Sequence, residues 1–339
     1  MTELPGLDLR RLEVWLDRNR PGLRQGELSG RLLTGGKSNL TYRLTDGVHA
    51  WALRRPPLGH VLPTAHDMAR EFRVISALRG TGIPVAGAVV LGEDPEVATA
   101  PFYLMDFVDG RVLSSADDTL ALSPQEAVRT GELLVDTLAA LHVLDPESVG
   151  LADFGRPAGF LERQLKRWHQ QWRSSETRPL DLLQATVDRL STAVPDGARP
   201  AIVHGDFRLA NTIFTSALDR IAAVIDWEMA TVGDPLTDLG VLMVYQSLAA
   251  DGDFGLAPLR PVAGHLTAAQ MAERYRTRSS RDLGRLNWYI GFGFFKLAVI
   301  SETIRHRHLA GKTVGAGFDR PGDDVPAMLE AALQALSDD

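Results

Sequence analysis

The pattern of apolar residues changes once along this chain of 339 residues, at Asp109-Gly110. Before this point, short apolar runs alternate with turn residues, which is typical of strands. Beyond it, apolar residues recur at the spacing of helices. The change predicts an α+β fold, with an N-terminal antiparallel β-sheet lobe carrying one inserted helix over residues 1–108 and a mainly helical C-terminal lobe over residues 109–339.

Turn signals divide the first lobe into its expected elements. Asp46-Gly47 is a strong hairpin signal between two apolar runs. Asp8 can cap an N-terminal helix, and apolar residues on one side of 67–78 predict the inserted helix. The expected strands cover residues 28–33, 40–45, 49–54, 85–92 and 101–108.

The second lobe shows helix signals throughout. Ser123-Pro124-Gln125-Glu126 forms a capping box with proline at the first helical position, which predicts a helix to about His142. Two short strands, 212–215 and 221–225, are expected to interrupt the helices. The further expected helices cover residues 157–173, 180–194, 236–249, 267–274, 281–308 and 325–336.

Composition limits the possible partners and compartments. The chain contains no cysteine, which excludes disulfides, thiolate catalysis and cysteine zinc sites and fits a reducing cytoplasm. Its net charge of −7 argues against a nucleic-acid partner. The N-terminus lacks the pattern of a signal peptide, and the apolar run 288–300 is too short to cross a membrane. We therefore expect a cytoplasmic protein without a membrane or nucleic-acid partner; its oligomeric state is unknown.

The segment 202–238, IVHGDFRLANTIFTSALDRIAAVIDWEMATVGDPLTD, carries the strongest chemical signal. Asp206 lies in a turn after an apolar run, where a carboxylate can orient a substrate hydroxyl and accept its proton. Asn211 offers an amide oxygen, a suitable ligand for Mg²⁺. Asp226 follows five apolar residues, where its charge is costly unless paired or metal-bound. Each residue alone is more often structural, but their order together favours metal-assisted phosphoryl transfer.

Three other residues of this segment have both a catalytic and a structural interpretation. Asp234 and Asp238 flank Pro235. A site role is open to them, but capping of the helix near residue 236 is favoured. His204 is a possible base, but a histidine in a turn beside a strand more often packs and fixes the loop. We therefore expect structural roles for these three residues.

In the first lobe, one strand presents a small residue beside a cation. Ala52 and Arg54 share a face because side chains alternate along a strand, so together they can admit a flat base and meet phosphates. The neighbouring Arg55 fits the description of a surface arginine. Glu71 lies on a partly apolar helix face and needs a cation, and Arg54 is its expected partner. A glutamate–arginine ion pair at an exposed position would be weak evidence, because such pairs contribute little to stability.

The loop Gly35-Gly36-Lys37-Ser38-Asn39 lies between two expected strands. Its backbone N–H groups could cover phosphates, although a glycine turn in a hairpin is commonplace. It is not a Walker A loop, because GxxxxGK[ST] is absent.

Together these residues resemble the aminoglycoside phosphotransferase and choline kinase-like branch of the protein-kinase fold. HGDFRLAN is similar to that family's catalytic loop, and IDWE is similar to its metal-binding segment. The resemblance extends from Gly35 to about Lys312. It implies a bilobal protein-kinase-like fold with a hinge at about 105–110, and ATP and Mg²⁺ as cofactors.

The resemblance also implies roles for single residues. Asp206 would be the catalytic aspartate, Asn211 and Asp226 the Mg²⁺ ligands, and Arg54 with Glu71 the pair that positions phosphates. FYLMDFVDG would place Met105 behind the adenine and the backbone of Asp106 to Val108 at its edge. The residues implied to bind the nucleotide are Gly36, Ser38, Ala52, Arg54, Glu71, Met105, Asp106 and Val108.

Two departures from the kinase pattern matter. GGKSN stands where kinases have GxGxxG, and Arg54 replaces the lysine that contacts phosphate. The same replacement characterises a subgroup that resembles the kinase-like domains fused to acyl-CoA dehydrogenases. Arginine keeps the charge but has a different shape, so lysine-like geometry does not follow.

The resemblance predicts a small-molecule kinase that acts on a hydroxyl, and two acceptor classes compete. A polycationic aminoglycoside would need carboxylates such as Asp319, Asp323, Asp324 and Glu330, which fit a solvated terminus better. A hydroxyacyl thioester would need an apolar slot and cations such as Arg305, His306, Arg307, His308 and Lys312, which also fit a charged helix end. An acyl-type or other non-aminoglycoside acceptor is favoured. The alternative function is a nucleotide-binding module without transfer activity.

Overall fold

The computed structural model describes residues 4–33, 39–58, 67–251, 262–311 and 322–337. It divides the chain into two compact units. The first comprises Met1–Arg111 with Ile213–Thr215 and Ala222–Ala230, and the second comprises the rest. The predicted α+β class, with an antiparallel sheet in the first part and mainly helices in the second, is confirmed.

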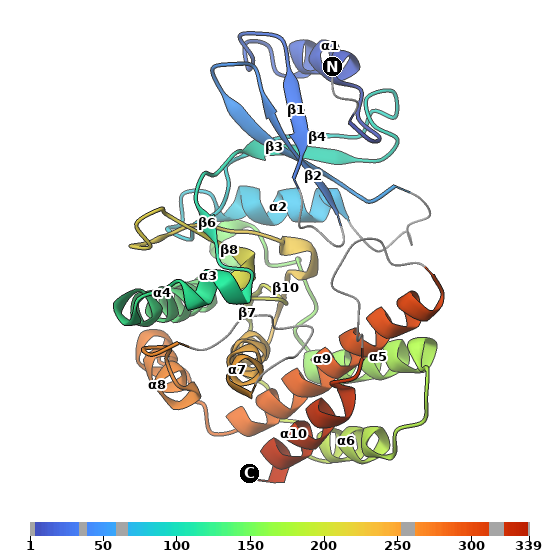
Figure 1. Cartoon of the computed structure of the whole chain (residues 1–339), viewed down its shortest axis with the longest axis vertical. Coiled ribbons are helices and arrows are strands. Elements are labelled where there is room, and N and C mark those ends of the chain that lie inside the picture. The colour runs from blue at the N-terminus through green and yellow to red at the C-terminus, as the bar shows by residue number, and fades with distance from the viewer. Residues whose placement is uncertain (1–3, 34–38, 59–66, 252–261, 312–321, 338–339) are drawn as a thin grey trace. The chain divides into compact units, whose positions relative to one another are not determined.

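The first unit is built on a five-stranded antiparallel sheet of order β1-β2-β3-β5-β4 (Figure 1). Helices α1 (Leu9–Asn19) and α2 (Met68–Leu78) lie on opposite faces of this sheet, and Asp8 and Asp67 cap them, as predicted for Asp8. The strands are β1 (Ser29–Leu32), β2 (Leu40–Thr45), β3 (Ala50–Arg55), β4 (Ala88–Gly92) and β5 (Phe102–Asp106).

Alternation along β3 assigns its side chains to the two faces. Trp51 and Leu53 enter the hydrophobic core beneath α1, whereas Arg54 extends to the α2 side, where it meets Glu71. Arg54 is paired in register with Tyr103 of β5, and Ala52 with Met105. The sheet thus places the predicted nucleotide-binding residues of β3 and β5 beside one another.

The expectation for Arg55 is wrong. Its side chain is 1% exposed, and its guanidinium donates to the backbone oxygens of Gly6 and Pro56 and to Thr99 Oγ1. The sheet is covered on both of its faces, so an arginine side chain that points to either face of β3 becomes buried. Arg55 therefore holds the N-terminal segment against the sheet.

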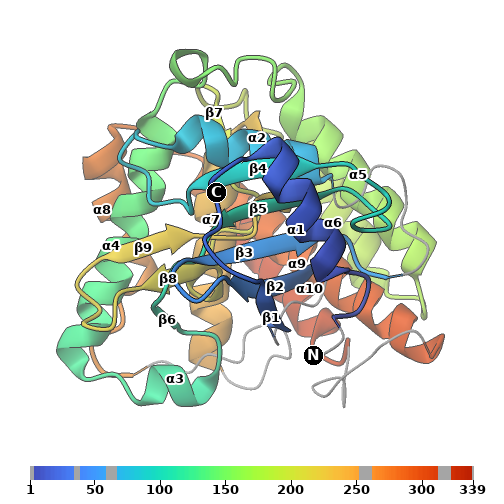
Figure 2. The same ribbon diagram turned by 90° about the horizontal axis from the view of Figure 1, so that it is seen from above.

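A second sheet, of order β6-β8-β9, carries the segment that leads to Asp226 (Figure 2). Its strands are β6 (Arg111–Val112), β8 (Thr212–Phe214) and β9 (Ile221–Val224), and a 3₁₀ turn η3 (Trp227–Met229) follows. Val224 N donates to Pro84 O at 2.8 Å, and η3 contacts α2. These contacts place Asp226 and Glu228 within the first unit, next to α2.

In the second unit, α9 (Leu286–Leu309) is the central helix and contacts α5, α6, α7 and α10. The capping box at Ser123 is present as predicted. Strand β7 (Ala201–Val203) pairs with β10 (Thr231–Gly233), which the sequence did not indicate. The other helices are α3 (Ala116–Leu120), α4 (Pro124–Val143), η1 (Glu147–Val149), α5 (Phe160–Ser175), α6 (Asp181–Thr192), η2 (Leu209–Asn211), α7 (Leu236–Asp251), α8 (Ala268–Ser279) and α10 (Val325–Ser337).

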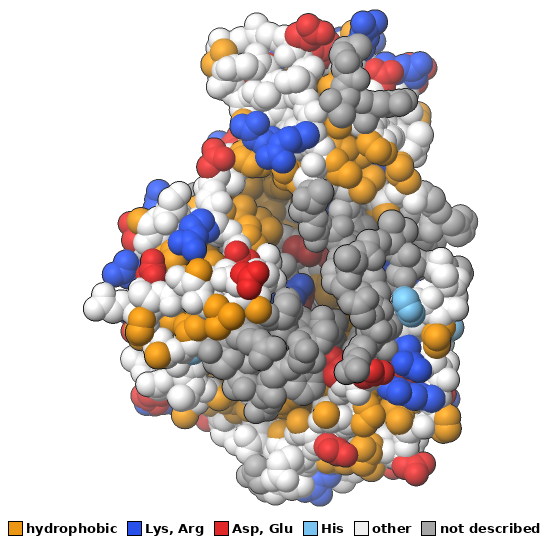
Figure 3. All heavy atoms as spheres, viewed as in Figure 1, with side chains coloured by type: hydrophobic (Ala, Val, Ile, Leu, Met, Phe, Trp, Pro, Cys, Tyr) orange, Lys and Arg blue, Asp and Glu red, His pale blue; other side chains and the backbone are white. Residues whose placement is uncertain are grey.

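The surface mixes charges of both signs. On the face shown in Figure 3, acidic and basic side chains are interspersed with apolar ones. In the part of the chain that the structure describes, no helix is long and apolar enough to cross a membrane.

Candidate active site

Asp206 lies in the loop between β7 and η2 of the second unit, with its carboxylate held from several sides. Asn211 Nδ2 donates to the Asp206 backbone oxygen at 2.8 Å and to its Oδ2 at 2.9 Å. Arg208 Nε approaches the same Oδ2 at 3.2 Å, and the Tyr245 hydroxyl donates to Oδ1 at 3.3 Å. Gly205, with φ of 87°, allows the turn that precedes Asp206. The loop therefore brings together two of the predicted site residues, Asp206 and Asn211.

Asp238 supports this loop from α7. Its carboxylate accepts hydrogen bonds from the backbone N–H groups of His204 at 2.7 Å and Gly205 at 2.8 Å. Burial by itself would raise the pKa of Asp238, but hydrogen bonds and charge from His142 and His204 hold that pKa below its usual value. Asp238 is structural, as expected, but it stabilises the loop that carries Asp206 instead of capping its own helix.

His142 and His204 extend the buried network around Asp238. His142 Nε2 lies 3.3 Å from Asp238 Oδ2, and its Nδ1 lies 2.7 Å from the Tyr275 hydroxyl. Burial lowers the pKa of His142, so the ring is neutral at pH 7. His204 is fully buried, and its Nδ1 accepts from the Asp206 N–H at 3.2 Å. Both rings position the loop, which agrees with the structural role expected for His204.

Asp234 behaves as the predicted cap. Its Oδ1 accepts from Leu236 N at 3.0 Å, and its Oδ2 accepts from Ala198 N and from the Tyr289 hydroxyl. These contacts fasten the segment before β7 to the start of α7.

Lys296 is a buried cation beneath the same loop. It is 6% exposed, and its ammonium donates to the Gly205 carbonyl and lies 5.4 Å from the centre of the Trp168 ring. Burial lowers the pKa of Lys296, whereas the charges of Asp206 and Asp238 favour its protonated form. In the sequence, Lys296 interrupts the apolar run 288–300. That interruption was the available signal, because a lone cation in such a run needs a buried partner.

In the first unit, Arg54 gathers three carboxylates. Its Nε lies 2.9 Å from Glu71 Oε2, at ion-pair distance but without hydrogen-bond alignment, so the expected pair is present. Its Nη2 donates to Asp226 and lies 3.7 Å from Glu228 Oε2. Asp226 adopts a left-handed conformation with φ of 68°, which is uncommon for a non-glycine residue and is often found at functional sites.

Two polar residues complete this cluster. Asn39 Nδ2 donates to Glu71 at 3.2 Å and to Glu228 at 2.9 Å, and the Tyr103 hydroxyl donates to Glu71 at 3.0 Å. Burial raises the pKa of Glu71 to about 7, against the opposing charge of Arg54. Sequence reasoning did not assign Asn39, Tyr103 or Glu228. Glu228 was accessible from the sequence, because it follows Asp226 by two residues in the IDWE segment.

The donor atoms fit a hard divalent cation. Asn211 uses its Nδ2 on Asp206, so its amide oxygen is the atom left for an ion. In the first unit, the described carboxylates of Glu71, Asp226 and Glu228 face the Arg54 guanidinium, so carboxylate groups outnumber this cation around Asp226. Within the described ranges, no group of three or more His, Asp or Glu side chains forms a metal site alone. A bound Mg²⁺ would therefore also use oxygen atoms of the nucleotide phosphates.

Several predicted nucleotide contacts rest on β5 and the segment after it. Asp106 N donates to Gly87 O at 2.8 Å and Phe107 N to Ala50 O at 3.1 Å, so both donors are committed to the sheet. The backbone groups that remain for the predicted contacts with an adenine edge are the Asp106 carbonyl and those of Val108. These contacts stay a prediction. Gly36 and Ser38 lie outside the described residues.

The groups considered for acceptor binding also have structural partners. Arg305 donates to Thr177 Oγ1 at 3.1 Å and lies 3.7 Å from Asp323, while Asp324 accepts from Ser301 at 2.7 Å. His306, Arg307, His308 and Glu330 are exposed or partly exposed, and Lys312 and Asp319 lie outside the described residues.

The chain is similar to known proteins over nearly its whole length. Acyl-CoA dehydrogenase family member 11 of Mus musculus is 32% identical over 342 residues, covering 96% of this chain and 43% of that protein. The chain thus spans less than half the length of this relative. The predicted likeness to acyl-CoA dehydrogenase-linked kinase-like domains is confirmed.

Solved structures show the same fold. One from Ralstonia eutropha JMP134, provisionally assigned as an aminoglycoside phosphotransferase, is 30% identical with a TM-score of 0.84 and covers 98% of this chain and 99% of that chain. Aminoglycoside phosphotransferase APH(4)-Ia, solved with AMP-PNP and hygromycin B, is 16% identical with a TM-score of 0.62, covering 96% and 97%. The second likeness concerns the fold alone.

A family model described as the phosphotransferase enzyme family matches residues 29–278, which include β1 to β5, the Asp206 loop and the Asp226 segment. On this match, this chain belongs to the phosphotransferase enzyme family and has the fold of its small-molecule kinases.

Proposed function

We propose that this protein is an ATP- and Mg²⁺-dependent kinase that phosphorylates a hydroxyl group of a small molecule. The observation that carries the proposal is the arrangement of the Asp206 loop, where one carboxylate is oriented by an amide, a phenol and a guanidinium. Such an arrangement suits a group that must aim a hydroxyl nucleophile. The absence of cysteine supports a reducing compartment such as the cytoplasm.

The residues have distinct roles in this proposal. Asp206 orients the acceptor hydroxyl and takes its proton, and Asn211 and Tyr245 hold the carboxylate in place. Arg54, positioned by Glu71, meets the phosphates. Asn211 and Asp226 would hold Mg²⁺, which when bound supplies charge neutralisation to the transferring phosphoryl group.

The charge of the first-unit cluster supports the use of a divalent cation. Glu71, Asp226 and Glu228 are the described carboxylates that surround Arg54. A divalent cation would offset the negative charge that Arg54 leaves unbalanced, which otherwise causes repulsion between these carboxylates in a partly buried place. We infer that Arg54 and the ion share Asp226 when nucleotide is bound.

The surroundings of Asp206 favour an acceptor that is not a polycation. Arg208 contacts its carboxylate, and Lys296 lies beneath the loop together with the buried carboxylate of Asp238; the Arg208 guanidinium lies 5.1 Å from the centre of the Tyr245 ring. A polycationic aminoglycoside would meet these cations, whereas a neutral or anionic alcohol would not be repelled. Together with the relatives' name, this favours a hydroxyacyl thioester or a similar alcohol.

One observation favours a second candidate function, a nucleotide-binding module without transfer activity. Arg54 donates a hydrogen bond to Asp226, the predicted metal ligand, and thereby occupies one of its oxygens. If that contact persisted with nucleotide bound, the metal would lose a ligand. The two candidates differ in turnover and agree in nucleotide binding.

The test combines nucleotide binding with turnover. We expect ATP with Mg²⁺ to raise the melting temperature, and a panel of alcohols that includes hydroxyacyl thioesters to reveal a product heavier by about 80 Da, the phosphoryl group. Asp206→Ala should abolish turnover and keep nucleotide binding, whereas Asp181→Ala, at an exposed site on α6, should keep both. Binding without turnover across the panel would favour the module, and an active Asp206→Ala variant would refute the assignment of the catalytic aspartate.

A further inference from the structure

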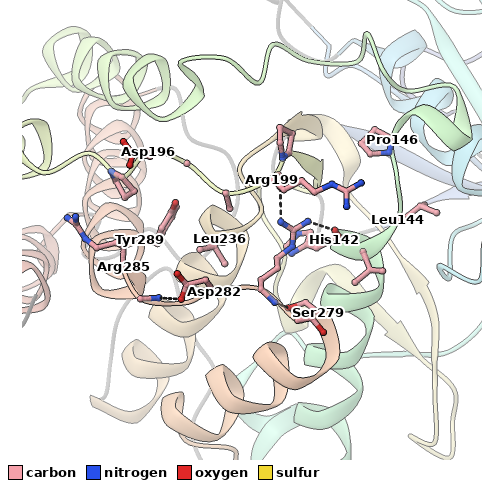
Figure 4. A pocket seen from close by; sticks show the side chains of 18 of the residues that line it. His142, Leu144, Pro146, Asp196, Arg199, Leu236, Ser279, Asp282, Arg285 and Tyr289 are labelled. Atoms are coloured by element: carbon pink, nitrogen blue, oxygen red, sulfur yellow. Dashed lines mark hydrogen bonds between the residues drawn. The ribbon is translucent and has the colours of Figure 1, made fainter.

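A cavity of about 620 Å³ lies within the second unit, away from the residues predicted for catalysis (Figure 4). It is bounded by the end of α4, the segment 195–200, the start of α7 and the connection from α8 to α9. Its volume falls in the range of small-molecule sites. Neither Asp206 nor Asn211 is among its lining residues, so the proposed phosphoryl transfer does not account for it.

Two arginines at this cavity, Arg199 and Arg281, form no ion pair with a carboxylate in the part of the chain that the structure describes. The Arg281 guanidinium donates to the backbone carbonyls of Arg199 at 2.7 Å and His142 at 2.6 Å. Among the described residues, no carboxylate oxygen lies within ion-pair distance of either Arg281 or Arg199. Burial lowers the pKa of Arg281, and the charge of the neighbouring Arg199 lowers it further, against Tyr275 and Asp234. An anion placed beside both guanidinium groups would relieve this repulsion.

The described carboxylates that line the cavity are not ion-pair partners of these two arginines. Asp145 and Asp282 accept hydrogen bonds from the backbone N–H groups of Glu147 at 3.2 Å and Gly284 at 3.0 Å. Figure 4 shows Asp196 at the end of the cavity opposite Arg199. Arg199 and Arg281 therefore make one end of the cavity cationic, whereas at the other end Arg285 lies on the same side as Asp196.

Apolar side chains border the cationic end. Leu144 and Pro146 lie on the same side of the cavity as Arg199 in Figure 4, and Leu236 lies between the two ends. A ligand that suits these walls combines an oxyanion with an apolar body. This pairing of a few charged groups with apolar lining is typical of metabolite sites.

The cavity is connected to the Asp206 loop by a series of buried and partly buried hydrogen bonds. Arg281 donates to the carbonyl of His142, whose ring contacts Asp238, and Asp238 accepts the N–H groups of His204 and Gly205. Each of these contacts lies inside the second unit. An anion that draws the Arg281 guanidinium toward itself would weaken its bond to His142 and change the support of the loop.

We propose that this cavity binds a small molecule carrying a phosphate or carboxylate group on Arg199 and Arg281, and that this binding adjusts the loop that carries Asp206. The site would be regulatory, because its occupant lies outside the proposed reaction. The proposal does not depend on which acceptor the enzyme uses. A phosphate monoester and a carboxylate share the required chemistry, so the experiment compares the two.

The experiment titrates the full chain with phenyl phosphate and with benzoate by isothermal calorimetry. We expect binding that is about tenfold weaker in Arg199→Ala, since a charge-assisted hydrogen bond is lost. Arg129→Ala, at an exposed position of α4 that does not line the cavity, is the matched control and should bind like the wild type. The ligand with the higher affinity identifies the source of the oxyanion.

Hydrogen–deuterium exchange locates the ligand and tests the coupling. We expect slower exchange in peptides covering 195–200 and 279–285, and altered exchange in the peptide covering 204–206. Arg281→Lys, which keeps the charge but cannot bridge both carbonyls, should retain binding and lose the change at 204–206. Binding that is absent, or equal in Arg199→Ala and wild type, would overturn the site. Binding that leaves exchange at 204–206 unchanged would overturn the coupling.

Discussion

The support that Asp238 gives to the Asp206 loop can be tested by one nearly isosteric change, Asp238→Asn. In the wild type, Oδ1 accepts the Gly205 N–H at 2.8 Å and Oδ2 accepts the His204 N–H at 2.7 Å. Asparagine retains one acceptor oxygen, so one of the two N–H groups would face an NH₂ group. The change leaves one buried backbone donor without a partner.

The expected cost follows from this geometry. An unsatisfied buried donor costs about 1–3 kcal/mol, and hydrogen bonds to a charged group are about twice as strong as neutral ones. Because Asp238 is 1% exposed, water cannot replace the lost acceptor without local opening. We therefore expect the free energy of unfolding to fall by about 2–4 kcal/mol. Turnover should fall at least about tenfold, because the Asp206 loop loses its fixed geometry.

Urea unfolding and ATP turnover provide the two measurements. Asp282→Asn is the control, since this exposed carboxylate accepts a single backbone N–H, from Gly284. Its cost should stay within about 0.5 kcal/mol. An Asp238→Asn variant with the stability and turnover of the wild type would show that the two hydrogen bonds do not support the loop.

Three further predictions rest on the buried charges. Because the pKa of Glu71 is raised from 4.5 to about 7 in the fold, the folded protein binds this proton more tightly, so the contribution of Glu71 to stability is fully present below about pH 4.5 and falls by about 3 kcal/mol as the pH rises to about 7. Urea unfolding at pH 5 and 7.5 should show this loss to be smaller in Glu71→Gln, and an equal loss would contradict it. Lys296→Met should lower turnover about tenfold, because the Gly205 carbonyl loses its hydrogen-bond donor. The free energy of unfolding should change by less than about 2 kcal/mol, because the substitution also removes a buried charge. Unchanged turnover would refute the role of Lys296 in supporting the Asp206 loop. Arg55→Ala should lower the free energy of unfolding by about 2–4 kcal/mol in urea melts. The control Arg10→Ala, at an exposed position, should cause a negligible change. Equal unfolding midpoints for Arg55→Ala and the wild type would contradict the burial of Arg55.

Much of the secondary structure was predictable because its signals are local. Strand β2 has the predicted limits, and the capping box at Ser123 and the Asp8 cap lie where the sequence placed them. A cap depends on residues three positions apart, and a strand depends on alternation within itself. The pair β7 and β10 was missed because each strand has three residues and its partner lies about thirty positions away.

The site was partly predictable for the same reason. The Arg54–Glu71 pair and the Asp206–Asn211 contact connect residues that the sequence had singled out. Tyr103, Lys296 and the loop-supporting role of Asp238 were not predicted. Each of them depends on a partner far along the chain, and nothing in the local pattern specifies that partner.

The sequence alone determined the strands of the first sheet, most of the helices and the residue types available for phosphoryl transfer, because caps, alternation and side-chain chemistry act over a few positions. Only the tertiary structure decided which faces of the sheet are covered, and with that the burial of Arg55. It also decided that Asp238 serves the Asp206 loop and that Arg199 and Arg281 meet at one cavity. These outcomes depend on packing between distant segments, where the burial of a charge is stabilising or costly according to the partner that the fold provides.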